Sequence, residues 1–369
     1  MPLAITLLLA ALSAFASEPG TSEAATRALA EASRSVLSLE MPAALDALAA
    51  VPAGQFTGKD ARVRACMLDT FGRAASPSPV AGIEDPFVRR VVAAYRSYWW
   101  HTLREPGRRV EFEARLGEAL AATLQIPAPT SEAAFDGLVE RVGIALRERG
   151  LHVQQGRTPP LHELLLWASE QPRTYEVALP EGFTQPVRVF ILEDFLSNGW
   201  MHYGRCGMRG PGGWATQEGL YAVKHRYDSF ASEQFRVSFL GHEAQHYADL
   251  RRWPDMPSWQ LEYRAKLTEL VLADDRLDRI IEQFIRTRTD DESLPHPYAN
   301  ARVIEDLRTR LDVAGGRTLV SVPPADIHRA ARMLLIRNTR ASQKGHGEHS
   351  GDRPAVSRSR GAGSRASTR

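Results

Sequence analysis

The sequence predicts an α+β fold that is mostly helical, and three stretches of the 369-residue chain support this prediction. Apolar residues recur at helical spacing through most of residues 22–150. In residues 174–180 and 187–195, β-branched and aromatic residues alternate with residues of other types, as is typical of strands. Helical spacing returns from residue 232 onward. We therefore expect an all-helical N-terminal region, a small sheet and a second group of helices.

The clearest N-terminal helix is expected within TSEAAFDGLVERVGIALRERG, residues 130–150. Thr130 or Ser131 can cap its first turn, and Gly150 stands where a glycine often ends a helix. Its apolar face would consist of Phe135, Leu138, Val142 and Leu146. Helices of this kind predict a helical N-terminal region over residues 17–158.

The pattern changes after Pro159. Residues 161–171, LHELLLWASEQ, are expected to form a short helix. Residues 218–228 are expected to add a strand, and the Gly-rich stretch 198–217 is expected to be a loop. Pro254 and Pro257 separate the first two of the helices that follow. The predicted helices of this part span residues 232–253, 258–285, 299–313 and 325–338.

The two ends of the chain are not expected to belong to the fold. Residues 1–16 have the apolar run and the small-residue ending of a signal peptide, with Ser17 as the new N-terminus. No Lys or Arg precedes the run, so a buried N-terminal helix is the alternative. Residues 341–369 hold six basic and two acidic residues, a net charge of +4, and almost no apolar ones. This composition predicts a disordered basic tail.

An exported chain would be periplasmic or secreted. In such a compartment its two cysteines could be oxidised. Cys66 and Cys206 are 140 residues apart and could form one disulfide, or they could be two buried thiols. No stretch after the signal peptide is apolar enough to span a bilayer. No basic helix face interleaved with aromatic residues predicts nucleic-acid binding. The oligomeric state has no signal in the sequence.

The motif that carries chemistry is FLGHEAQHYADL, residues 239–250. His242 and His246 are four residues apart, so on a helix they share one face. Two such imidazoles can bind one Zn²⁺ at about 2.0–2.1 Å. Glu243 is then placed to take a proton from a water that the metal activates. The alternative is an ordinary buried helix whose histidines bond each other.

A catalytic zinc needs a third protein ligand. Where the metzincin pattern requires a glycine and a further ligand, this chain has Asp249 and Arg252, so that pattern fails. The next predicted helix offers Glu262 in its first turns, and we prefer this residue. Glu269, two turns further along the same face, is the alternative ligand, or it would orient a ligand histidine.

HEAQHYAD…LEYRAKLTEL resembles the active-site helices of gluzincin-type zinc metallopeptidases. The resemblance covers roughly residues 170–300 and is specific mainly at His242, Glu243, His246 and Glu262. It implies a zincin-like core within residues 159–340, one Zn²⁺ and the hydrolysis of peptide or protein substrates. One position departs from the pattern, because Lys266 stands where many gluzincins have an acidic residue that orients a histidine. Asp249 or Glu269 could substitute for it.

The resemblance also implies a residue that stabilises the oxyanion opposite the zinc. LPHPYANARV supplies Tyr298, our candidate, and His296, while Tyr263 and Arg264 are closer to the motif in the sequence. A different class of function remains open: a non-catalytic zincin-like scaffold that binds a partner through its helical N-terminal half. The intact Glu243 argues against this reading, because a scaffold does not need that carboxylate.

Overall fold

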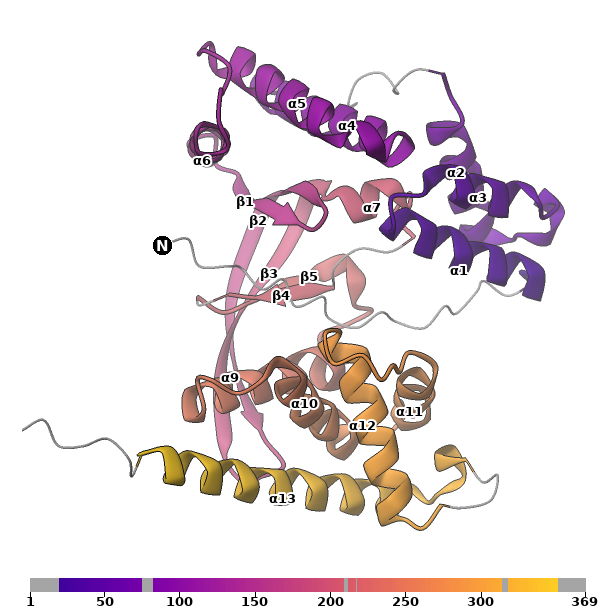
Figure 1. Cartoon of the computed structure of the whole chain (residues 1–369), viewed down its shortest axis with the longest axis vertical. Coiled ribbons are helices and arrows are strands. Elements are labelled where there is room, and N and C mark those ends of the chain that lie inside the picture. The colour runs from indigo at the N-terminus through magenta and orange to yellow at the C-terminus, as the bar shows by residue number, and fades with distance from the viewer. Residues whose placement is uncertain (1–19, 75–81, 209–211, 217, 314–317, 351–369) are drawn as a thin grey trace, which may run out of the picture. The chain divides into compact units, whose positions relative to one another are not determined.

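The computed structural model describes the chain in two compact units, coloured by residue number in Figure 1. The first unit consists of Met1–Glu176 and Pro186–Phe239, and the second of Val177–Gln185 and Leu240–Arg369. Each is described by itself. The residues whose structure is described are 20–74, 82–208, 212–216, 218–313 and 318–350.

The first unit opens with six helices, as the spacing of apolar residues predicts. Capping side chains define several of their starts: Ser22 accepts the backbone N–H of Ala25, and Ser131 accepts that of Ala134. Ser131, rather than Thr130, is therefore the cap of the clearest helix. The helices are α1 (Glu23–Leu37), α2 (Met41–Ala49), α3 (Gly58–Phe71), α4 (Pro86–Arg104), α5 (Arg109–Leu124) and α6 (Glu132–Arg147).

A five-stranded mixed sheet follows, with the strand order β1-β2-β3-β5-β4. β1 pairs with β2 and β4 with β5 in antiparallel fashion, whereas β3 and β5 are parallel. Together with the helices, this sheet confirms the α+β class and the mostly helical content. The strands are β1 (His152–Thr158), β2 (Leu161–Ala178), β3 (Thr184–Asn198), β4 (Gly213–Ala215) and β5 (Leu220–Val223).

The expected short helix at residues 161–171 is wrong, because these residues are the first part of β2. Pro159 and Pro160 form a two-residue connection that pairs Thr158 with Leu161, so the chain returns along β1 as a hairpin. Every residue from Leu161 to Trp167 is buried. A short apolar run that is buried on both faces has no alternation, and its spacing cannot distinguish a strand from a helix.

The Gly-rich stretch 198–217 is not only loop. It contains the short helix α7 (Trp200–Gly204) and strand β4. The Trp200 and Trp214 side chains are fully buried, and the Trp200 indole N–H donates to the Thr158 carbonyl. The strand expected at 218–228 is shorter, since β5 ends at Val223 and a 3-10 turn follows. Large indole rings in a glycine-rich segment are therefore core residues here.

The sheet shares its core with the N-terminal helices. Trp99 of α4 donates its indole N–H to the His162 carbonyl of β2, and Leu161 and Leu164 join the same apolar cluster. This packing explains why the compact units divide the chain after Phe239, and not between residues 158 and 159 where the sequence pattern changes. Cys66 and Cys206 form a disulfide within this unit, with their Cα atoms 6.0 Å apart, so the first of the two alternatives is correct.

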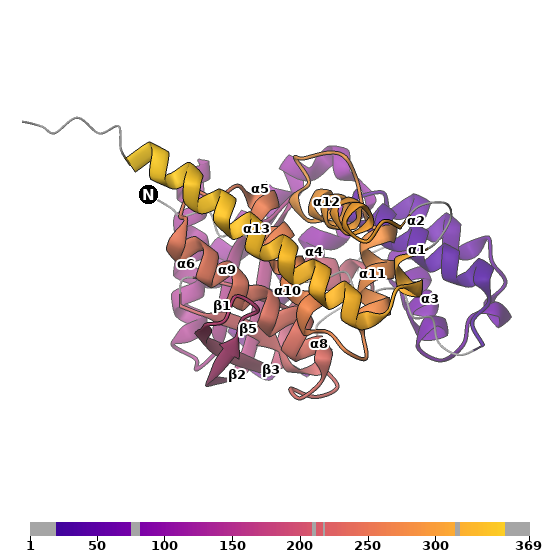
Figure 2. The same cartoon turned by 90° about the horizontal axis from the view of Figure 1, so that it is seen from below.

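The second unit is a group of helices, in which α13 packs against α10 and also contacts α12 (Figure 2). Two boundaries differ from the expected ones. The helix expected over 258–285 is two helices, because Ala273 is extended and its carbonyl accepts a hydrogen bond from His328. The helix expected from residue 299 begins earlier, at Pro295. The helices are α9 (His242–Arg252), α10 (Ser258–Leu272), α11 (Leu277–Arg286), α12 (Pro295–Arg310) and α13 (Pro324–Ser350).

Helix α13 continues beyond residue 340, where we expected the folded chain to end. Ser342 is buried, and its hydroxyl accepts a hydrogen bond from the Gln260 amide at 3.1 Å. The first part of the expected tail, up to Ser350, is therefore helical. The remaining tail, residues 351–369, and the expected signal peptide lie outside the described residues. Among the helices that are described, none has the length and apolar character that crossing a membrane requires.

Candidate metal centre

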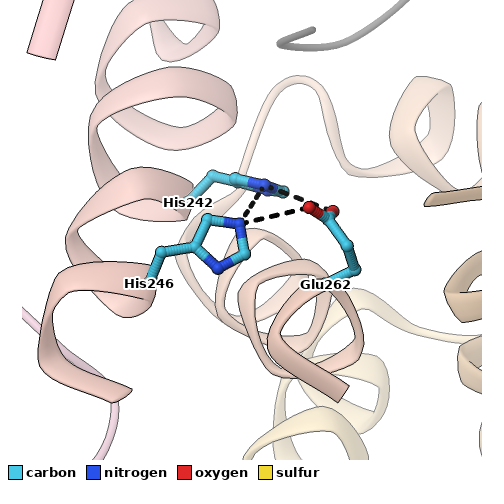
Figure 3. Close-up of side chains that lie close together, drawn as sticks. All are labelled: His242, His246 and Glu262. Atoms are coloured by element: carbon cyan, nitrogen blue, oxygen red, sulfur yellow. Dashed lines mark hydrogen bonds and ion pairs between the residues drawn. The ribbon is translucent and has the colours of Figure 1, made fainter. Parts of the chain in front are cut away.

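His242 and His246 both project from α9 toward the same point, as Figure 3 shows. A single turn of helix separates them, and their Nε2 atoms are 3.0 Å apart. Both side chains are buried. The helix is preceded by a π-helical turn, Arg236–Gly241, of a type often found next to functional sites.

Glu262 reaches the same point from α10, the next helix. Its Oε1 lies 3.3 Å from His246 Nε2, and its Oε2 lies 3.5 Å from His242 Nε2. In a tetrahedral zinc site with ligands at about 2.0–2.1 Å, neighbouring ligand atoms are about 3.3–3.4 Å apart. The three observed separations bracket that value. The buried group His242, His246 and Glu262 could therefore hold a metal ion.

Glu269 is not among these three residues and contacts the centre in another way. Its Oε1 is 2.7 Å from His242 Nδ1, so the ring N–H on that side donates to the carboxylate. With its proton at Nδ1, a neutral ring has its lone pair at Nε2, the atom that lies between His246 Nε2 and Glu262 Oε2. Burial acts to lower the pKa of His242, but Glu269, Glu262 and Glu243 together raise it. Of the two roles that the sequence left open for Glu269, the geometry matches the orienting one.

Lys266 occupies the position where the resemblance implies an acidic residue. Its Nζ is 3.8 Å from Glu262 Oε2 and lies over the ring of Phe284. The ammonium therefore faces the ligand carboxylate and does not orient a histidine. Asp249, the other possible substitute, bonds to Arg264, so Glu269 is the acidic residue that contacts His242 Nδ1.

Asp249 belongs to a buried network that joins α9 to α10. Arg264 is fully buried and binds Asp249 through two hydrogen bonds, at 2.8 and 2.9 Å. The same guanidinium reaches Glu181 at 3.1 Å, and Thr339 of α13 at 2.9 Å. A bidentate pair fixes the orientation of both partners. This network fixes the packing of α9 against α10, the two helices that carry the candidate metal ligands.

Glu243 stands beside the centre without a partner. Its side chain is 1% exposed, and neither carboxylate oxygen has a hydrogen bond in the part of the chain that the structure describes. Burial is the main cause of its raised pKa. The two histidines act to lower this pKa, while Glu262 and Glu269 raise it further. An unpaired buried carboxylate is costly, and such groups are typical of functional sites.

The structure brings His296 to the group, and not Tyr298. His296, in the first turn of α12, has its Nδ1 2.7 Å from Glu262 Oε2, and its ring stacks on His242 with 6.4 Å between centroids. The ring of Tyr298 packs edge-on against Trp259. The other two candidates also bond elsewhere, since Tyr263 donates to Asp306 and Arg264 binds Asp249. In the described part of the chain, the ring contact of Tyr298 is with Trp259 and not with a candidate metal ligand.

The state of His296 follows from its surroundings. Burial lowers its pKa, although Glu262 opposes this change. The 2.7 Å contact places the His296 ring directly beside the Glu262 carboxylate. His296 can therefore orient the Glu262 carboxylate, as Glu269 orients His242.

Comparison of the chain with protein-family models, curated proteins and solved structures finds no match.

Proposed function

We propose that this chain is a zinc-dependent metallopeptidase that hydrolyses peptide bonds, with Glu243 as its general base. The observation that carries the proposal is the unpartnered Glu243 carboxylate next to two imidazoles and a carboxylate at tetrahedral-ligand spacing. The two-nitrogen, one-oxygen donor set is one that catalytic zinc sites use. The same set in a closed structural site would need a fourth protein ligand.

Each residue then has a role that its contacts support. His242, His246 and Glu262 would hold the ion, which when bound polarises a carbonyl and makes water acidic near neutral pH. Glu243 accepts the proton of the attacking water and passes it to the leaving amine. Glu269 and His296 hold His242 and Glu262 in position. Tyr298 keeps its proposed oxyanion-stabilising role from the resemblance alone, because its ring contact is with Trp259.

The setting of the enzyme is also a proposal. A disulfide between Cys66 and Cys206 is compatible with an oxidising compartment. Together with the N-terminal apolar run, it supports export to the periplasm or the medium. We likewise propose that the second unit, with its paired metal-binding helices, is the zincin-like part of the chain.

The test combines metal counting with activity. We expect about one zinc per purified chain and cleavage within a mixed peptide library that stops on chelation and returns with zinc. Glu243→Gln should keep the zinc but lower kcat/KM by a factor of about 100 to 10,000, because only the proton acceptor is lost.

Glu282→Gln is the matched control, since Glu282 is an exposed residue of α11 in the same unit, and it should cleave like the wild type. Zinc bound at full stoichiometry with no cleavage of any peptide would refute the enzyme and favour the binding scaffold.

A further inference from the structure

The outward face of α13 is rich in arginine and has no role in the chemistry proposed above. In Figure 2 the helix runs in front of α10, on the outside of the second unit. Its inward side chains, such as Ala331, Leu334 and Leu335, are buried. On the opposite side, six residues are exposed or half-buried, and we call them the basic face: Arg329, Arg332, Met333, Ile336, Arg337 and Arg340.

The spacing of these six residues makes the basic face continuous. Positions i, i+3, i+4, i+7, i+8 and i+11 lie on one side of an α-helix, and the six residues follow this order from Arg329 to Arg340. At a rise of 1.5 Å per residue, the face is about 17 Å long. Arg310 of α12 adjoins it, because its Nη2 is 2.8 Å from the Sδ of Met333. Five exposed arginines therefore share one surface.

Two carboxylates contact this surface, and they balance its charge only in part. Arg329 is 3.4 Å from Asp326, and Arg337 is 3.8 Å from Asp306. The two arginine side chains nevertheless remain 70% and 66% exposed. Exposed pairs of this kind contribute little free energy, so an outside anion can take the place of either carboxylate. With two carboxylates beside five arginines, the surface is positively charged.

The composition around the basic face favours a lipid surface over a nucleic acid. Met333, near the middle of the face, is an exposed large apolar side chain at 47%, and the half-buried Ile336 lies beside it. Residues 324–350 contain no Phe, Tyr or Trp, the side chains on which single-stranded bases stack. An apolar side chain among cations suits the interface of a bilayer. Residues 341–369, which begin within α13, add six basic and two acidic residues.

We propose that the basic face of α13 binds the surface of a bilayer that contains anionic phospholipids. The guanidinium group of an arginine matches the oxygens of a lipid phosphate, and about four to eight basic residues on one helix are typical of binding to anionic lipids. Met333 would enter the headgroup layer while the helix lies along the surface. The proposal does not depend on the hydrolase function, because none of these residues is a candidate metal ligand.

Sedimentation of the full chain with lipid vesicles tests the proposal. We expect binding to vesicles of equal parts phosphatidylcholine and phosphatidylglycerol, little binding to phosphatidylcholine alone, and a loss of binding at high salt. Arg329→Gln/Arg340→Gln should weaken the binding about 25-fold, because each basic residue near an anionic surface strengthens binding about fivefold.

Arg62→Gln/Arg73→Gln is the matched control. It removes the same charge from two exposed arginines in and directly after α3, in the first unit, and it should bind like the wild type. The wild type and both double variants should have the same melting temperature, because substitutions of exposed side chains change stability little. A difference in binding then reports on the surface and not on folding.

Competition with duplex DNA separates the lipid from a nucleic acid. DNA added at the same concentration of phosphate groups should leave the chain on the vesicles, because only a bilayer offers Met333 an apolar layer. Release of the chain by DNA would assign the basic face to nucleic acid and overturn the proposal. It is also overturned if the wild type does not bind the anionic vesicles, or if the two double variants bind them equally well.

Discussion

Glu243 and Glu163 each follow a histidine in the sequence, and both are buried, but their contacts differ. Glu243 lies on a helix, and neither of its oxygens has a partner in the described structure. Glu163 lies on strand β2, where its Oε1 accepts the backbone N–H groups of Leu164 and Trp200. Gly199, with φ +83°, lets the chain pass directly against this carboxylate. The same dipeptide thus gives an unpaired buried carboxylate in one place and a hydrogen-bonded one in the other.

Glu163 should make the protein less stable as the pH rises. Burial raises its pKa to about 7, above the ordinary 4.5. Between these values the unfolded chain releases the proton while the folded chain keeps it, so the free energy of unfolding falls as pH rises from about 5 to 7. This group alone would account for about 3 kcal/mol. Glu163→Gln, which keeps the acceptor oxygen, should remove that part of the slope in urea unfolding.

Glu140→Gln is the control for this measurement, because Glu140 is an exposed residue of α6. Its pH profile of stability should run parallel to that of the wild type. Parallel profiles for Glu163→Gln and wild type would contradict the raised pKa.

The ligand assignment can be tested at two residues of α10. Glu262→Ala should abolish zinc binding, because it removes one of three ligand groups. Glu269→Ala should leave the ligand set intact and weaken zinc about 10- to 100-fold, the usual cost of losing a bond that orients a ligand. Competition with a chromophoric chelator gives both affinities. A Glu269→Ala protein without zinc beside a Glu262→Ala protein with zinc would reverse the assignment.

At the scale of the elements, a network of buried charged side chains holds α9 to α10 in addition to their apolar contacts. Arg264 has no exposed surface and binds Asp249 of α9 by two hydrogen bonds, and Glu181 lies against the same guanidinium. A buried pair of this kind adds little net stability but fixes orientation, and it is costly to break. The two helices that carry the metal ligands are therefore oriented from outside the metal centre.

Arg264→Ala should lower the free energy of unfolding by about 3–5 kcal/mol, because two buried carboxylates lose their cation. Urea unfolding measures the change. Arg302→Ala breaks an exposed pair with Glu305 on α12 and should change stability by less than about 1 kcal/mol. An equal, small effect of both substitutions would show that the network does not hold the helices.

At the scale of the whole molecule, the two units carry different features. The first contains most of the sheet and the disulfide, and the second contains the candidate metal ligands His242, His246 and Glu262. The disulfide joins α3 to the segment after α7, across 140 residues of sequence. A crosslink over so long a loop restricts the unfolded chain strongly.

Cys66→Ser/Cys206→Ser should therefore lower the free energy of unfolding by about 2–5 kcal/mol. Its zinc content should be unchanged, because the metal ligands lie in the second unit. Urea unfolding and metal analysis give both results. Alkylation of the denatured, unreduced wild type should label no cysteine; labelling of two would show that the disulfide is absent.

The sequence by itself determined the local part of the site. Helical periodicity places His242 and His246 on one face whatever the rest of the fold does, and Pro254 and Pro257 put Glu262 in the next helix. Tertiary packing decided the rest. It made residues 161–171 a strand, because only burial on both faces distinguishes such a run from a helix. It brought His296 to Glu262, since a contact across dozens of residues leaves no periodic signal in a single sequence.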